Sequence, residues 1–205
     1  MWSTLTNVGD IAVMMPAAVI VSFWLLSQRK WPGACLWPLL FALGCALVLA
    51  SKLAFVGWGL GCAALDFTGI SGHTLLACTV FPMVSYLALG AFKARWRFIG
   101  AAVGWLFGGL IGYSRLMVHA HSSSEVLSGL GLGLIITLVF VVLDTPPQRA
   151  ARGEWLLFGV LALMMTLQFG VKAPGQDMVT RIALRLSGHS APYLRGHWRN
   201  THCTL

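Results

Sequence analysis

The sequence predicts an all-α fold, a polytopic membrane helical bundle of about six transmembrane helices. Of its 205 residues, 58% are hydrophobic and only 10% are charged, whereas about a quarter of the residues in soluble domains are charged. Basic residues stand in the gaps between long apolar segments, so the net charge of +8 reflects membrane topology, and nucleic acid is not an expected partner. The five cysteines form no CxxC pair, so we expect inert thiols and neither disulfides nor a metal site.

Six segments are long and apolar enough to cross a bilayer as helices, which takes about 20 residues each. No Lys or Arg precedes the first segment, so we expect it to be a transmembrane helix and not a signal peptide. Glycines repeat every four residues in the fourth segment, which predicts close helix packing. The six segments are 8–27, 34–51, 73–92, 98–113, 122–143 and 155–171.

The distribution of basic residues predicts the direction of these spans. The connections after the first, third and fifth segments lie on one side and carry seven of the fourteen Lys and Arg residues. We expect that side to be cytoplasmic. The connections 52–72 and 114–121 would then face outward, on the periplasmic or extracellular side of a plasma (inner) membrane.

A basic tail, 172–205, follows the expected membrane domain, 1–171. Apolar residues recur in this tail at helical spacing while two arginines occupy another face. This pattern predicts a short amphipathic helix on the membrane surface. Its apolar residues are Val179, Ile182, Ala183 and Leu186.

Polar side chains gather where the connections meet the expected outer face of the membrane. Charged groups near hydrocarbon are costly, so such a cluster is by default a functional-site hypothesis. Counting helices places all of its members at the same depth. They are Lys52 at the end of the second segment, Ser71, Gly72 and His73 at the start of the third, and Ser114, Arg115, His121 and Glu125 between the fourth and the fifth.

These side chains suit phosphoryl transfer. Cations and helix N-termini bind phosphate, and arginine can hold two oxygens at once. One imidazole can attack phosphorus while the other protonates the leaving oxygen. Glu125 stands four residues after His121, so on a helix its carboxylate lies beside the imidazole and can fix the tautomer.

Ser-Gly-His at 71–73, followed by Ser-Arg at 114–115, five residues, His121, three residues and an acid, resembles the type 2 phosphatidic acid phosphatase superfamily of lipid phosphatases. The pattern of that family is Lys, six residues, Arg-Pro; then Pro-Ser-Gly-His; then Ser-Arg, five residues, His, three residues, Asp. The resemblance implies a metal-independent hydrolase that needs no cofactor and acts on the phosphate or diphosphate of a lipid in the bilayer.

The resemblance also implies a role for each residue of the cluster. His121 would be the nucleophile that forms a phosphohistidine, and Glu125 would orient it. His73 would protonate the leaving alkoxide and later activate water. The phosphoryl oxygens would be held by Arg115, Lys52, Ser71 and the Gly72 backbone, with Ser114 in a supporting position.

The sequence departs from the family pattern at three places. Gly59-Leu60 stands where the family has Arg-Pro, so one phosphate-binding cation is absent. Ile70 replaces the proline before the Ser-Gly-His motif. Glu125 replaces aspartate, and its extra methylene can displace His121 enough to slow the reaction. Alternative functions are therefore a catalytically weak relative that binds anionic lipids and a lipid-phosphate phosphotransferase.

Several residues of the cluster also fit structural interpretations. Ser122 and Glu125 match a capping box at a helix start, a role that is compatible with orienting His121. Ser71 can be the N-cap of the third segment. Lys52, at the end of a span, can simply extend to the interface.

Three other polar positions lie outside the motif pattern. His119 is out of register with the motif, and we expect it to be a polar residue at the end of a helix. The tail repeats Ser-Gly-His at 187–189, but no apolar segment follows, so we expect this second copy of the motif to be coincidental. Asp66 fits either a substrate loop or a solvated acid.

Overall fold

The computed structural model describes residues 2–92, 95–144 and 175–196, together with positions 159, 163 and 170. Within these residues the chain is helical and forms no β-strand, which confirms the all-α prediction. A short 3-10 helix, η1 (Ala63–Leu65), lies in the connection between α3 and α4. The α-helices are α1 (Trp2–Val8), α2 (Ile11–Ser27), α3 (Trp31–Trp58), α4 (Gly72–Phe92), α5 (Trp96–Met117), α6 (Ser123–Leu143) and α8 (Gly175–Ser187).

Four helical stretches of the described chain are long and apolar enough to cross a membrane, and they cover the first, second, third and fifth expected spans. The fourth expected span corresponds to α5, which has 22 residues and carries an arginine near each end. The expected span 155–171 lies outside the described residues, apart from three single positions. The fold is thus a helical membrane bundle, and the count of six spans stays a prediction.

The helix ends follow from local sequence. The Asp10 side chain caps α2 by accepting the N–H of Ala12 at 2.9 Å. At the end of α3, Gly59 adopts a left-handed φ of 68°. Its N–H donates to the carbonyl of Phe55 at 2.7 Å, and the next N–H donates to the carbonyl of Ala54 at 3.1 Å, so the left-handed glycine turns the chain back over the last carbonyls of the helix.

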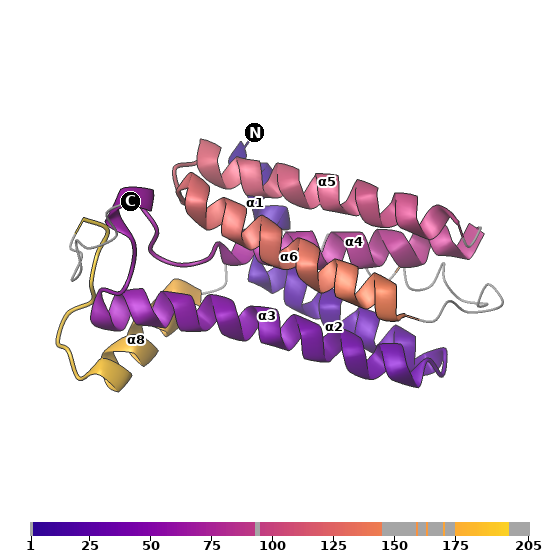
Figure 1. The fold of residues 1–205 in the computed structure, drawn as a ribbon, viewed down its shortest axis with the longest axis horizontal. Coiled ribbons are helices and arrows are strands. Elements are labelled where there is room, and N and C mark those ends of the chain that lie inside the picture. Colours follow the sequence, from indigo (N-terminus) through magenta and orange to yellow (C-terminus); the bar gives the residue numbers. More distant parts are fainter. Residues whose placement is uncertain are drawn as a thin grey trace.

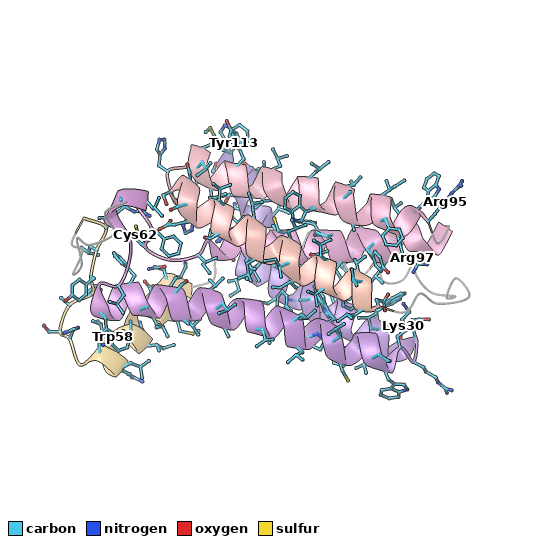
Figure 2. The ribbon with its side chains drawn as sticks, viewed as in Figure 1. Lys30, Trp58, Cys62, Arg95, Arg97 and Tyr113 are labelled. Atoms are coloured by element: carbon cyan, nitrogen blue, oxygen red, sulfur yellow. The ribbon has the colours of Figure 1, made fainter. Side chains whose placement is uncertain are left out.

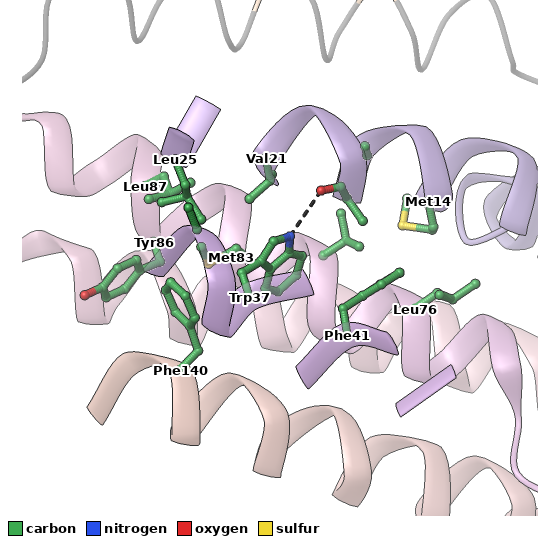
Figure 3. Close-up of a cluster of buried hydrophobic side chains, with 14 of the residues drawn as sticks. Met14, Val21, Leu25, Trp37, Phe41, Leu76, Met83, Tyr86, Leu87 and Phe140 are labelled. Carbon is green, nitrogen blue, oxygen red and sulfur yellow. Dashed lines mark hydrogen bonds between the residues drawn. The ribbon is translucent and has the colours of Figure 1, made fainter. Parts of the chain in front are cut away.

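Packing brings α4 to the centre of the bundle, in contact with α2, α3, α5 and α6 (Figure 1). The expected close approach in the fourth segment is present: a Cβ added at Gly104 would lie 2.4 Å from the carbonyl oxygen of Phe81 in α4. The main core joins α2, α3, α4 and α6 around Trp37, whose indole N–H donates to the Ala18 carbonyl at 3.1 Å (Figure 3).

The two ends of the bundle differ in composition. Figure 2 places Lys30, Arg95 and Arg97 at one end, and Trp58, Cys62 and Tyr113 toward the other. At the basic end, two residues meet the carboxylate of Asp144: the Lys30 ammonium at 3.5 Å and the Tyr86 hydroxyl at 3.2 Å. The connections that hold the polar cluster lie at the opposite end.

The tail forms its expected helix, α8, which packs against the C-terminal half of α3 (Figure 1). Val179 and Ala183 of α8 are buried against Phe55 and Val56 of α3. The bundle, and not lipid, therefore takes up these two apolar side chains of the amphipathic pattern.

The four cysteines in the described residues are of two kinds. Cys35, Cys45 and Cys78 are free, as expected. Cys62 is disulfide-bonded, so the expectation of inert thiols is wrong at this position. Pairing between distant cysteines depends on the fold, and cysteine spacing along the sequence does not reveal it.

Candidate active site

His121 and Glu125 form a direct pair at the start of α6. The imidazole Nδ1 lies 2.6 Å from the Glu125 carboxylate, which is fully buried. Ser122 and Glu125 also form the capping box: the Ser122 N–H donates to the same carboxylate oxygen at 3.2 Å, and its hydroxyl accepts the Glu125 N–H at 3.4 Å. One carboxylate thus caps the helix and contacts the histidine, so the two interpretations of Glu125 are compatible.

The Glu125 carboxylate has further donors on its other oxygen. Both the N–H of Thr68, at 2.7 Å, and the Thr68 hydroxyl donate to Oε1. A guanidinium nitrogen of Arg195, from the tail, lies 2.9 Å from Oε1 and 3.0 Å from Oε2. Loop, helix and tail therefore converge on one carboxylate.

His73 stands in the first turn of α4 and also meets a carboxylate. Its Nε2 lies 3.3 Å from Asp10, the residue that caps α2. Each histidine of the cluster thus has a carboxylate partner, one from the N-terminal region and one from α6. Carboxylates in this position fix the imidazole tautomer and stabilise its charged form.

Arg115 lies in the last turn of α5, and its guanidinium is only partly satisfied. One terminal nitrogen donates to the Thr6 hydroxyl at 3.0 Å. The Nε atom is buried and has no hydrogen-bond partner among the described residues. An unmatched donor on a buried cation is costly unless an anion arrives.

Lys52 lies on α3 beneath the loop that leads to α4. A Cβ added at Gly69, whose φ is 141°, would lie 3.1 Å from the Lys52 side chain and 3.2 Å from its backbone nitrogen, so a glycine is needed there. The Ile70 N–H donates to the Ser51 hydroxyl at 3.0 Å and holds the loop on α3. Lys52 is close enough to His73 and His121 for its charge to act on both imidazoles.

The pKa of His121 lies below its usual value of 6.5. Burial is the largest cause, and the positive charges of Lys52 and Arg115 act in the same direction. The hydrogen bond to Glu125 opposes them without cancelling the effect. At neutral pH the imidazole is therefore uncharged, with Nδ1 held by Glu125 and Nε2 left to attack an electrophile.

The other predicted positions serve the backbone around the pair. The buried Ser71 N–H donates to the Glu125 carbonyl at 3.0 Å, and the Ser71 hydroxyl accepts from Thr74 at 2.9 Å. Gly72 is the first residue of α4. The buried Ser114 hydroxyl donates to the Ile111 carbonyl at 2.6 Å. The Ser71 side chain thus bonds to the first turn of α4 and the Ser114 side chain bonds within α5, while the backbone of Ser71 joins the start of α4 to α6 beside Glu125.

The positions outside the motif pattern have separate environments. His119 is exposed and has a left-handed φ of 54°. The His189 imidazole lies 2.7 Å from the Gly57 carbonyl, at the end of α3. Asp66 forms an ion pair with Arg195.

Four residues that contact the charged side chains and histidines of the site were not predicted. They are Thr6, Asp10, Thr68 and Arg195. Asp10 carried a usable signal, because an aspartate before an apolar run is a typical N-cap at a helix end. Thr68 and Arg195 stand 57 and 70 positions from Glu125, and no spacing rule connects them to it.

Comparison with known proteins gives two matches. The family model of the PAP2 superfamily matches residues 57–148, which include His73, Arg115, His121 and Glu125. The chain is also 38% identical over 202 residues to an uncharacterized 22.5 kDa protein in the cps region of Klebsiella pneumoniae, with 95% of each chain covered. No solved structure matches.

Proposed function

Since this chain belongs to the PAP2 superfamily, whose members are phosphatases in general, we propose that it hydrolyses a lipid phosphate or diphosphate. The observation that carries the proposal is the pairing of His121 with Glu125 at 2.6 Å, with Arg115 and Lys52 near the same imidazole. A neutral, oriented imidazole beside two cations is suited to attack a phosphoryl group whose charge those cations hold.

In the first step, Nε2 of His121 attacks phosphorus and the bond from phosphorus to the lipid oxygen breaks. His73 gives its proton to that leaving oxygen, so an alcohol, or a lipid monophosphate from a diphosphate, departs. Asp10 holds Nε2 of His73, which leaves Nδ1 as the nitrogen that transfers the proton. The product is a phosphohistidine on His121.

In the second step, His73 takes a proton from water and the resulting hydroxide attacks phosphorus. The bond between phosphorus and Nε2 of His121 breaks, inorganic phosphate leaves, and both histidines regain their starting states. Arg115 and Lys52 hold the phosphoryl oxygens in both steps. The buried Nε of Arg115 supports this role, because it has no partner in the described part of the chain and a phosphate oxygen would satisfy it.

The membrane and its orientation belong to the same proposal. The site lies at one end of apolar helices, where the phosphate of a lipid would meet the interface. The basic residues Lys30, Arg95 and Arg97 gather at the opposite end, which favours a cytoplasmic position for that end. Disulfides form in oxidising compartments, so the bonded Cys62 favours an outward-facing site. We place the protein in the plasma (inner) membrane, with a membrane domain over 1–171.

Turnover on a substrate panel tests the proposal. Protein purified in detergent is incubated with phosphatidic acid, an isoprenyl diphosphate and a phosphorylated glycolipid, with and without EDTA. We expect phosphate release from at least one lipid, unaffected by EDTA and abolished in His121→Ala. Full activity in His121→Ala would refute the assignment, and lipid binding without turnover would favour a binding protein. Transfer of phosphate to an added alcohol in place of water would indicate a phosphotransferase.

A further inference from the structure

The C-terminal tail is anchored to the site end of the bundle. After α8, the His189 imidazole lies 2.7 Å from the Gly57 carbonyl, and the Tyr193 N–H donates to the Val56 carbonyl at 3.0 Å. These carbonyls belong to the last turn of α3, where no further helical turn is present to supply donors. The tail therefore satisfies the end of α3, and its next residues reach the loop above the site.

Arg195 links that loop to the buried carboxylate of the nucleophile pair. One terminal nitrogen donates to the Asp66 carbonyl at 3.0 Å, and the guanidinium forms an ion pair with the Asp66 side chain. The other terminal nitrogen donates to both oxygens of Glu125, at 2.9 and 3.0 Å. The Arg195 side chain is 41% exposed whereas that of Glu125 is 0% exposed, so the arginine reaches inward from the surface.

The position of Arg195 distinguishes between two roles, a ligand of the phosphate and a partner of the Glu125 carboxylate. It contacts the carboxylate that holds Nδ1 of His121, and in an imidazole ring Nδ1 and Nε2 point in diverging directions. A phosphoryl group on Nε2 would therefore lie on the far side of the ring from Arg195. Arg195 does not replace the absent family arginine as a phosphate ligand, and its partner is the Glu125 carboxylate.

Glu125 has a specific need for such a partner. A glutamate has one more rotatable bond than the aspartate of the family pattern, so its carboxylate has more positions available. Thr68, Ser122 and Arg195 together donate to both carboxylate oxygens and leave a single arrangement.

We propose that Arg195 is a positioning residue that acts through Glu125 to hold His121 for attack, and that the tail is in this way part of the active site. The inference rests on the proposed function for its catalytic meaning. The effect of the Arg195 charge on the Glu125–His121 pair can be measured without turnover.

Charges from several elements act on the His121 imidazole: Lys52 from α3, Arg115 from α5 and Glu125 from α6. Asp66 of the loop forms an ion pair with Arg195. From α4, His73 is held by Asp10. Removal of the Arg195 charge leaves the negative charge of Glu125 less balanced, so the protonated form of His121 becomes more stable. His121 would then lose its proton at a higher pH than in the wild type.

The test compares Arg195→Gln, Arg195→Lys and Arg185→Gln in the full-length protein. Arg185 is an exposed arginine of α8 and serves as the matched control. Diethyl pyrocarbonate modifies neutral imidazole, so its reaction with His121, followed by peptide mass spectrometry across pH, reports protonation directly. We expect the half-maximal pH to rise in Arg195→Gln and to stay near the wild-type value in Arg195→Lys and Arg185→Gln.

Activity on the best lipid of the panel provides the second readout. We expect kcat to fall by about tenfold to a hundredfold in Arg195→Gln, with little change in KM, because a displaced nucleophile costs rate and not binding. Arg195→Lys should recover part of that loss.

An unchanged His121 titration in Arg195→Gln would overturn the inference, whether or not the protein turns over lipid. Wild-type protein that is inactive on the whole panel, combined with a shifted titration, would instead refute the proposed function and leave the positioning contact standing. Size-exclusion profiles of the three variants identify any variant that fails to fold, and if Arg195→Gln does so, Arg195→Ala carries the titration test with the same expected rise.

Discussion

Two histidines with two carboxylates organise the chemistry at the residue scale. His121 is held by Glu125 at 2.6 Å and His73 by Asp10 at 3.3 Å, and the carboxylates come from regions more than one hundred residues apart. The short contact is the one at the proposed nucleophile, where angular precision matters most. The longer contact is at the proposed proton donor, where the carboxylate favours the protonated ring.

Asp10→Asn tests the second pair. Asparagine is as good an N-cap as aspartate, so α2 should keep its start while His73 loses its anionic partner. We expect kcat on a lipid phosphate to fall about tenfold to a hundredfold. The fall should be much smaller on an aryl phosphate, whose acidic leaving group needs no proton.

Asp177→Asn, at an acidic position in the first turn of α8, is the matched control and should leave both rates unchanged. Equal losses on the two substrates in Asp10→Asn would show that Asp10 does not serve proton transfer.

At the element scale, the site depends on how closely α5 approaches α4. A Cβ added at Gly104 would lie only 2.4 Å from the carbonyl oxygen of Phe81, so the two helices can approach this closely only because residue 104 is glycine. This approach brings Arg115, at the end of α5, to the level of His73, at the start of α4. The same packing therefore sets both stability and the position of Arg115, the proposed phosphate ligand.

Gly104→Ala is expected to separate the two helices and to destabilise the fold by about 1–3 kcal/mol, because the obstructing atoms belong to the backbone. Thermal unfolding in detergent measures the effect as a lower Tm. Gly131→Ala is the control, since among the described residues no atom beyond its chain neighbours and its own helical backbone lies within 4 Å of a Cβ added there. Equal Tm values for the two variants would contradict this packing argument.

Sequence reasoning predicted the parts of the site that depend on short spacing. Glu125 stands four residues after His121, and although His121 lies two residues before α6, the Glu125 side chain turns back over the helix start and meets it, as the short spacing predicted. Arg195 carried no such signal, because its contact arises from the return of the tail along α3. Cys62 illustrates the same difficulty, since a disulfide joins positions that only the fold brings together.

At the scale of the whole molecule, the site is assembled from both ends of the chain. Thr6 and Asp10 reach Arg115 and His73 from the N-terminal region, and Arg195 reaches Glu125 from the tail. The absent family arginine is consistent with the backbone: Gly59 ends α3 with a left-handed φ that an arginine rarely adopts. The left-handed helix end thus favours glycine at this position, whereas the family motif has arginine, and this chain carries the glycine.

The most direct test of the central claim is to trap the covalent intermediate. The lipid of the panel that is turned over fastest, radiolabelled in its phosphate, is mixed with the protein, quenched in alkali within a turnover and mapped by peptide mass spectrometry. We expect label on His121 that is stable in alkali, lost in acid and absent in His121→Ala. Rapid turnover with label on a different residue, or with no labelled enzyme under conditions that preserve phosphohistidine, would contradict it.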